Sequence, residues 1–173
     1  MFGMGVRIKE TVTADGKKLK KMLEELGKLE VAVGIQEGEK YPDGTSVLDV
    51  AMWNELGTET IPSRPFIRDS VDNHVGEIQE LVKLTAEKLL KGIPLEGALE
   101  GLGAFQAGLI QEEIRHGNFQ KNAAITVHGG WMKNKRSGKP VYVKGKKSDA
   151  PLIDTGRLRQ SVHYVIREKG KGD

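Results

Sequence analysis

The chain has 173 residues, which is enough for one ordinary domain and too few for two domains with independent cores. It contains no run of about 18 apolar residues, and its first residues lack the apolar stretch of a secretory signal, so we expect neither a membrane span nor Sec export. The absence of cysteine excludes disulfide scaffolds, thiolate zinc sites, iron–sulfur clusters and cysteine nucleophiles.

The net charge of +3 hides an asymmetry along the chain. Residues 1–114 contain 13 Lys and Arg against 20 Asp and Glu, whereas residues 115–173 contain 14 against 4. The two parts therefore carry opposite signs. Because attraction to clustered anions adds over many charges, the basic part is suited to contact with nucleic acid or with an acidic neighbour.

The first elements predicted along the chain are a strand, a helix and a second strand. Residues 6–12 alternate apolar and polar side chains, as a strand with one solvent-facing side does, and the strand is expected to end at Asp15 and Gly16. Residues 31–35 alternate in the same way and are expected to pair with the first strand. The segment between them is predicted to be a helix because its apolar residues fall at helical spacing and a glycine follows them: Leu19, Met22, Leu23, Leu26 and Gly27.

A stiff proline link separates two helices predicted in the middle of the chain. Residues 47–56 are rich in apolar side chains and are followed by Gly57, which indicates a short helix. Pro62 and Pro65 favour an extended backbone between them. Because proline suits the first position of a helix, we expect a long helix over residues 65–90.

A second long helix is predicted over residues 95–116, although it contains four glycines. Each glycine costs about 1 kcal/mol relative to alanine inside a helix. We expect close packing against a neighbouring helix to explain why the chain keeps Gly97, Gly101, Gly103 and Gly108.

The character of the chain changes after Gly117. Residues 131–147 contain seven Lys and Arg and no acidic residue. Within them Val141 and Val143 flank Tyr142, a pattern that indicates one strand of a hairpin. We therefore expect a long basic loop or β-arm, over about residues 118–150.

These elements predict one α+β domain over residues 1–173, with the basic arm inserted before the last strand. A helical turn is expected at residues 155–160. A small antiparallel sheet is expected to pack against the two long helices, and its predicted strands are residues 6–12, 31–35 and 161–167.

One tripeptide matches a catalytic motif. Asp154, Thr155 and Gly156 have the core sequence of aspartic proteases, in which two such carboxylates share a proton in a dimer. Arg157 and Arg159 follow, whereas a protease needs a small residue after the glycine, and two guanidinium groups would depress the raised pKa that the acid requires. We therefore interpret the tripeptide as a structural cap, in which the Asp154 side chain caps the helical turn.

The sequence indicates no other catalytic, metal or cofactor site. The four histidines are widely separated, and none has a ligand spacing such as His-x-x-x-His. The glycine-rich stretches lack the Gly-Lys-Ser/Thr that cradles nucleotide phosphates. We therefore expect a protein without enzymatic activity, without a cofactor and without a metal.

Three short stretches carry a recognisable pattern. They are VAVGI at residues 31–35, AMWNELGTETIPSRPFIRDS at residues 51–70 and PLIDTGRLRQSVHYVI at residues 151–166. Taken in order, they resemble the tail-completion or head–tail joining proteins of long-tailed bacteriophages, which are small virion proteins of the neck. The second stretch is similar to the family's Asn-Glu-aromatic-Gly-Thr followed by Ile-Pro-x-Arg-Pro-Phe-aliphatic-Arg, with Leu56 where the family commonly has an aromatic residue.

The resemblance implies a structural role in the virion neck, joining the tail to the DNA-filled head as a ring. It implies a homo-oligomer, with six copies favoured and twelve as the alternative, made in the host cytoplasm. The implied partners are head connector or adaptor proteins and tail terminator or tail tube proteins, with non-specific contact to genomic duplex DNA. The alternatives are a tail terminator that caps the tail tube and a sequence-independent DNA-binding protein.

A ring that repeats one heterologous contact needs two different adhesive surfaces on each subunit. Glu55 is either a surface acid or the partner of Arg64 or Arg68 in an ion pair. Trp53 and Phe66 are each either core residues or contact residues. The candidates for the subunit interface lie along the proline link: Glu55, Gly57, Pro62, Arg64, Pro65, Phe66 and Arg68.

The basic residues of the arm are candidates for contact with DNA in the ring lumen or for docking onto an acidic neighbour. Phosphate contacts of this kind need no reading of base sequence. A solvated loop is the alternative interpretation. The candidates are Lys133, Lys135, Arg136, Lys139, Lys144, Lys146 and Lys147.

Overall fold

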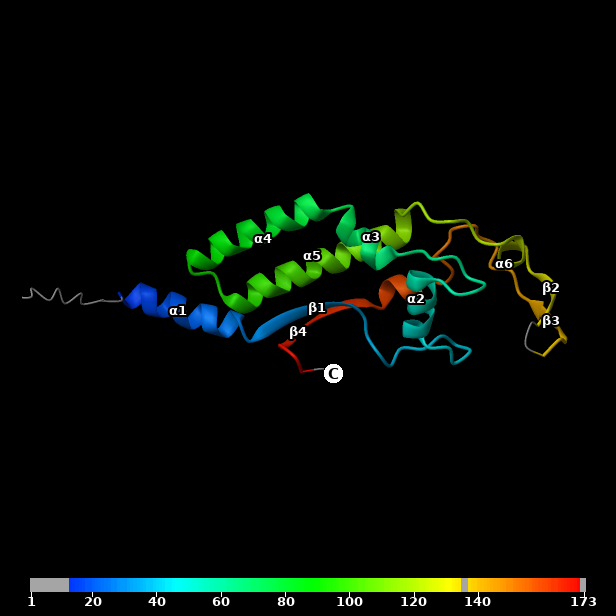
Figure 1. Cartoon of the computed structure of the whole chain (residues 1–173), viewed down its shortest axis with the longest axis horizontal. Coiled ribbons are helices and arrows are strands. Elements are labelled where there is room, and N and C mark those ends of the chain that lie inside the picture. The colour runs from blue at the N-terminus through cyan, green and yellow to red at the C-terminus, as the bar shows by residue number, and fades with distance from the viewer. Residues whose placement is uncertain (1–12, 135–136, 172–173) are drawn as a thin grey trace, which may run out of the picture.

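The computed structural model describes residues 13–134 and 137–171 of an elongated α+β protein (Figure 1). The strand expected at residues 6–12 lies outside these residues. In chain order the described elements are α1 (Ala14–Leu26), β1 (Leu29–Ile35), α2 (Val47–Leu56), α3 (Phe66–Asp72), α4 (Val75–Leu90), α5 (Leu95–His116), α6 (Ala124–His128), β2 (Gly130–Lys133), β3 (Pro140–Val143), α7 (Arg157–Gln160) and β4 (Val162–Glu168).

The described strands form two separate antiparallel pairs. β1 pairs with β4 along its whole length, so that Val33 lies opposite Tyr164 and Ile35 opposite Val162. Those side chains face α5. Figure 1 shows α5 lying between this sheet and α4, and α5 contacts both strands as well as α4. Of the two helices expected on the sheet, α5 therefore lies against it and α4 packs on α5.

The start of α1 differs from the expectation. Asp15 and Gly16 form the first turn of the helix instead of ending a strand, because Thr13 is the N-cap and its Oγ1 accepts a hydrogen bond from the Gly16 N–H (3.2 Å). The helix ends at Gly27, as expected. No side chain of α1 is buried, and Figure 1 shows the helix projecting from the end of the body.

The long helix expected over residues 65–90 is two helices. α3 ends at Asp72, with Asn73 as its C-cap, and α4 begins after His74, whose backbone leaves the helical region (φ −124°, ψ 20°). Asp72, Asn73 and His74 are weak helix formers, and Asn and Asp compete for backbone hydrogen bonds. The apolar periodicity of the sequence continues across this break, which is why it predicted one helix.

The glycines of α5 do not pack against a neighbouring helix. At Gly103 a Cβ would lie 2.5 and 2.6 Å from ring carbons of Tyr164, so this glycine lets β4 approach the helix closely. At the other three positions a Cβ would meet nothing within 4 Å, namely Gly97, Gly101 and Gly108. The expectation is therefore wrong for those three, and for Gly103 the neighbour is a strand.

The hydrophobic core lies where the second half of α5 meets α2, α3, α7 and the start of β4. Ala107, Ile110 and Ile114 recur at helical spacing on the buried side of α5. Phe66, at the first position of α3, is fully buried. The other buried members are Val47, Ala51, Leu152, Leu158 and Val162.

The segment expected as the basic arm, residues 118–150, projects from the opposite end of the body to α1 (Figure 1). It carries α6 and the hairpin of β2 and β3, in which Trp131 lies opposite Tyr142. The strand expected around Tyr142 is confirmed as β3. Among the described residues, no helix is long and apolar enough to cross a bilayer.

Candidate functional site

A cluster of polar contacts holds the joint between α2 and α3, which we define as residues 54–68. In its first part, a side chain from the end of α2 caps the start of α3. The Glu55 carboxylate accepts hydrogen bonds from the backbone N–H groups of Ile67 (2.9 Å) and Arg68 (3.1 Å). The first N–H groups of a helix have no partner within it, and α3 has no capping side chain of its own, so Glu55 fills this role. Of the two interpretations of Glu55, the ion pair with Arg64 or Arg68 is not formed in the described structure, and the carboxylate is not a free surface acid either.

The link between the two helices folds tightly around Gly57. Gly57 has a positive φ of 76°, and a Cβ at this position would lie 2.9 Å from the backbone nitrogen of Ser63. The Ser63 hydroxyl donates to the carbonyl of Glu55 (2.8 Å), and the N–H of Thr58 donates to the carbonyl of Ile61 (2.8 Å). Only glycine suits both the conformation and the space.

Arg64 connects the joint to the start of the arm. Its side chain is buried and donates from Nε to the carbonyl of Gln120 (3.0 Å), and from its terminal nitrogens to the side-chain oxygens of Asn54 (2.9 Å) and Asn122 (3.3 Å). All three acceptors are uncharged. Burial lowers the pKa of Arg64 from its ordinary value. The guanidinium therefore serves as an internal crosslink between two segments distant in sequence.

This arrangement changes the role of two predicted interface residues. Arg64 and Phe66 are buried inside the chain, so they are not exposed for contact with a second subunit. Arg68 has an exposed side chain, and Glu55 and Gly57 are half-buried, as are both prolines, Pro62 and Pro65.

The root of the arm is closed by a second set of polar contacts. The Asn122 amide donates to the carbonyls of Asp149 (3.2 Å) and Ala150 (3.1 Å), which brings the outgoing and returning segments together. Lys146 Nζ donates to the carbonyls of Ala150 (2.5 Å) and Ile153 (2.8 Å). Burial lowers the pKa of Lys146, and the nearby Asp154 carboxylate opposes that shift. Lys146 was predicted to contact DNA or a partner, but its amine is engaged inside the chain.

The other described lysines of the arm are exposed. Lys133 lies in β2, Lys139 precedes β3, and Lys144 and Lys147 follow it. Lys135 and Arg136 lie outside the described residues. The positive charge of the hairpin is therefore presented to the surroundings rather than compensated within it.

The Asp154, Thr155, Gly156 tripeptide forms a helix entry, but not in the expected way. Gly156 is the N-cap of α7, with a left-handed φ of 77°, and the helix has no side-chain cap. Thr155 Oγ1 accepts a weak hydrogen bond from the N–H of Arg157 (3.4 Å). Asp154 instead lines a pocket of about 260 Å³ at the root of the arm, together with Tyr41 and Lys146. Burial raises the pKa of Tyr41, and the Asp154 carboxylate adds to that rise.

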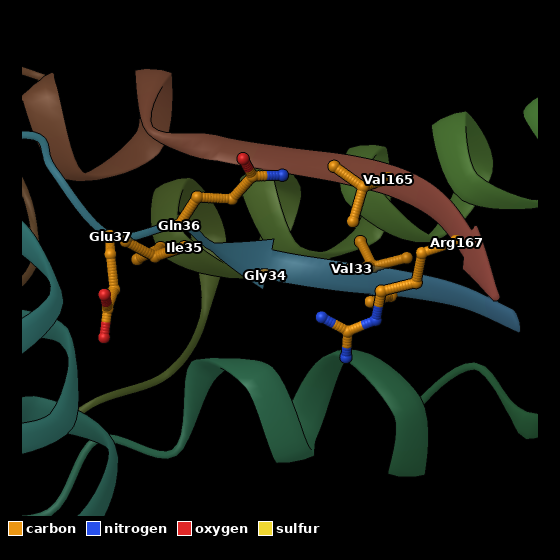
Figure 2. Close-up of a pocket in the computed structure, with 8 residues that line it drawn as sticks. Val33, Gly34, Ile35, Gln36, Glu37, Val165 and Arg167 are labelled. Atoms are coloured by element: carbon orange, nitrogen blue, oxygen red, sulfur yellow. The ribbon is translucent and has the colours of Figure 1, made fainter. Parts of the chain in front are cut away.

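A pocket of about 320 Å³ lies along β1 and β4 (Figure 2). Ala32, Gly34 and Val165 line it with small or apolar groups, and Figure 2 shows Glu37 and Arg167 at its two ends. Arg167 is paired with Glu30 (2.8 Å), so its charge is already compensated.

No metal site is formed within residues 13–134 and 137–171. Within these residues no three His, Asp or Glu side chains come together in a way that could hold an ion. His163 lies near Glu39 (3.7 Å), whose carboxylate also accepts a hydrogen bond from the Ser161 hydroxyl, and His116 lies near Glu112 (3.7 Å).

Sequence reasoning missed the partners of Arg64. Asn54 precedes Glu55 at the end of α2 and also donates to the carbonyl of Val50 (2.8 Å), which orients its oxygen toward Arg64. The adjacent Asn and Glu before a glycine were a usable signal, since such residues cap and close turns. The contribution of Asn122, 58 positions from Arg64, has no local signal.

Comparisons with known proteins give no relatives for this geometry. No protein-family model matches the chain, and neither the curated proteins nor the solved structures contain a match. The resemblance to phage neck proteins therefore stays a prediction from the three stretches of sequence.

Proposed function

We propose that this chain is a structural subunit of a phage neck, which assembles as a ring around the DNA channel and joins the tail to the head. The observation that carries the proposal is that large apolar side chains lie exposed on three separate elements. These are Leu23 on α1 (53% exposed), Leu56 on α2 (65%) and Trp131 on β2 (72%). Each of them lies beside another exposed apolar side chain, namely Leu19, Met52 and Tyr142, and contiguous apolar surface marks contacts with other proteins.

The placement of these surfaces suits a repeating contact. α1 and the β2–β3 hairpin project from opposite ends of the body (Figure 1), and they differ in shape and sequence. A closed ring is built from heterologous contacts, in which one surface of a subunit meets a different surface of the next. A subunit with distinct adhesive elements at separate positions meets that requirement.

The joint supports the proposal because ring closure needs constant angles between the contact surfaces, and two of these surfaces, on α2 and at the end of the arm, are attached to the joint. Arg64 ties the root of the arm to the joint, and Glu55 ties α2 to α3. Both contacts lie within one chain. The directions of α2 and of the arm root are therefore coupled before assembly begins.

The exposed lysines of the arm favour an additional contact with duplex DNA. Lys133, Lys139, Lys144 and Lys147 present charges that would meet phosphate without reading sequence. The same residues support the second candidate, a sequence-independent DNA-binding protein. Tight retention of duplex DNA by the free subunit on filters, with a steep loss of binding as salt rises, would favour that candidate.

The resemblance supplies the neighbours: head connector or adaptor proteins on one side, and tail terminator or tail tube proteins on the other. Six copies are favoured and twelve are the alternative. A tail terminator that caps the tube would use the same kind of ring, and its position in the particle distinguishes it.

The test is a density map of an intact particle together with sedimentation of the purified chain. We expect closed rings and density for the chain between head and tail. Location on the capsid shell, or absence from the particle, would refute the proposal. Turnover of a substrate that is lost in the Asp154→Asn variant would also refute it, because it would indicate a protease.

A further inference from the structure

The exposed side of α2 is an apolar surface, and the charged residues of the helix are all acidic. Met52 (50% exposed), Trp53 (43%) and Leu56 (65%) lie on adjacent positions of the helix surface, and we call them the α2 face. Residues 46–63 contain three acidic residues and no lysine or arginine. Glu55 is engaged in capping α3, whereas Asp49 and Glu59 are exposed and have no ion pair within the part of the chain that the structure describes.

The hairpin carries the opposite combination. Trp131 and Tyr142 are cross-strand neighbours with their ring centroids 5.5 Å apart in an edge-to-face arrangement, and they are 72% and 59% exposed. Lys133 lies two residues from Trp131 and therefore on the same side of the ribbon. We call these three residues the hairpin face. Residues 130–144 contain five Lys and Arg and no acidic residue.

The two faces are complementary in chemistry and are separated within one chain. Tyrosine and tryptophan are enriched among the residues that anchor protein interfaces, and a polar rim around an apolar centre is the usual anatomy of such contacts. In Figure 1 the hairpin lies at the far end of the arm, away from α2. An intermolecular contact is needed to cover both faces.

We propose that the hairpin face of one copy docks on the α2 face of a second copy, an inference that rests on the ring proposed above. Contact between two α2 faces would bring the acidic residues Asp49 and Glu59 of one copy near those of the other. Contact between two hairpin faces would bring Lys133 and the neighbouring basic residues of one copy near those of the other. Like charges brought together at an interface cost affinity, whereas the mixed pairing places positive beside negative charge. Since the two faces differ, the contact is heterologous and continues from copy to copy.

The experiment uses two variants of the full chain. The hairpin variant carries Trp131→Ala and Tyr142→Ala, and the α2 variant carries Leu56→Asp; all three side chains are exposed, so both chains should fold. In sedimentation, each variant alone should lose the association of the unaltered chain. An equimolar mixture should form a heterodimer and stop there, because one intact pair of faces remains. Val82→Asp, on the exposed side of α4 (49%), is the matched control and should associate normally.

A charge exchange gives an independent readout. Lys133→Glu should weaken association about tenfold, a change of roughly 1.4 kcal/mol. Adding Asp49→Lys to the same chain should restore most of that loss. Failure of the second substitution to restore association would count against the pairing of these two faces.

If the purified chain is monomeric, the same contact is tested in assembled particles. The chain contains no cysteine, so the double variant Met52→Cys, Tyr142→Cys should form a ladder of disulfide-linked chains on oxidation, and neither single variant should. Absence of the ladder would overturn the inference.

Failure of the proposed docking and failure of the neck assignment give different experimental results. Rings that survive both the hairpin and the α2 substitutions would overturn the docking and leave the neck assignment standing. A hairpin variant that loses retention of duplex DNA and keeps normal association would show that the hairpin face binds nucleic acid instead. Absence of the chain from the particle would instead refute the neck assignment itself.

Discussion

The joint and the hairpin use the same types of residue for different purposes. In the joint and the arm root, Arg64 and Lys146 are withdrawn from solvent, and their donors bind carbonyl and amide oxygens of the same chain. In the hairpin, Lys133 and Lys144 are exposed and have no acidic neighbour in sequence between them. In this protein the buried basic side chains therefore hold the fold together, and the exposed ones are available for contact. Composition alone does not show which residues are buried.

The apolar residues follow the same division. Phe66 completes the core beside α5, whereas Trp131 and Tyr142 contact each other at the end of the arm. A two-stranded hairpin is marginally stable by itself in water. We infer that the body is stabilised by its own contacts and that the hairpin offers its surface to a partner.

The largest effect should come from Phe66→Ala. The side chain is fully buried, and removing a buried phenylalanine costs about 3–5 kcal/mol of unfolding free energy because a cavity remains. Leu56→Ala is the control, since its side chain is 65% exposed and its loss should cost less than about 0.5 kcal/mol. Chemical denaturation of both variants measures the difference. Equal losses would contradict the separation of core and contact residues.

Two glycine substitutions in α5 should change the free energy of unfolding in opposite directions. Gly103→Ala should destabilise the chain by about 1–3 kcal/mol, because the new methyl group would overlap Tyr164. Gly101→Ala, on the open side of the same helix, should stabilise it by up to about 1 kcal/mol through helix propensity. Thermal unfolding of the two variants tests this. A gain in both would mean that β4 does not lie against α5 at this point.

Removing the remote cap should have a moderate effect. Glu55→Ala leaves the N–H groups of Ile67 and Arg68 without their acceptor, which should cost about 1–2 kcal/mol. Glu59→Ala removes an exposed acid and should leave stability unchanged. Unfolding in urea measures both. Equal stability of the two variants would show that Glu55 is a surface acid after all.

The smallest effect on stability is expected at the hairpin. Trp131→Ala should change the unfolding free energy of the isolated chain by less than about 0.5 kcal/mol, because the side chain lies outside the core. Local order should fall, with faster hydrogen exchange of the hairpin amides at Met132 and Val141. A loss as large as that of Phe66→Ala would place the hairpin in the folding core.

Much of the fold was predictable because its signals are local. Helical spacing and terminal glycines defined α2 and the end of α1 closely, and the bounds of α5 agree with the expected residues 95–116. The break between α3 and α4 was missed because apolar periodicity continues through it and only the weak helix propensity of residues 72–74 marks it. The glycines of α5 were misjudged because sequence does not show which side of a helix meets a neighbour.

The candidate site was less predictable because its contacts join distant residues. The sequence identified Glu55 and Arg64 as candidate interface positions and left open whether Glu55 is a surface acid or pairs with Arg64 or Arg68. Glu55 instead binds backbone N–H groups, and Arg64 binds amide oxygens. These partners are uncharged, so the pattern of charged residues does not reveal them. Lys146 was grouped with the other arm lysines because burial, which distinguishes it, depends on the return of the chain at residues 149–153.

The acceptors around Arg64 carry a consequence for acid conditions. Carboxylates take up protons near pH 4, and ion pairs that depend on them weaken there. Asn54, Asn122 and the carbonyl of Gln120 have nothing to protonate in that range, and an arginine keeps its charge throughout it. The attachment of the arm to the body should therefore persist under acid conditions in which ion pairs that depend on carboxylates weaken.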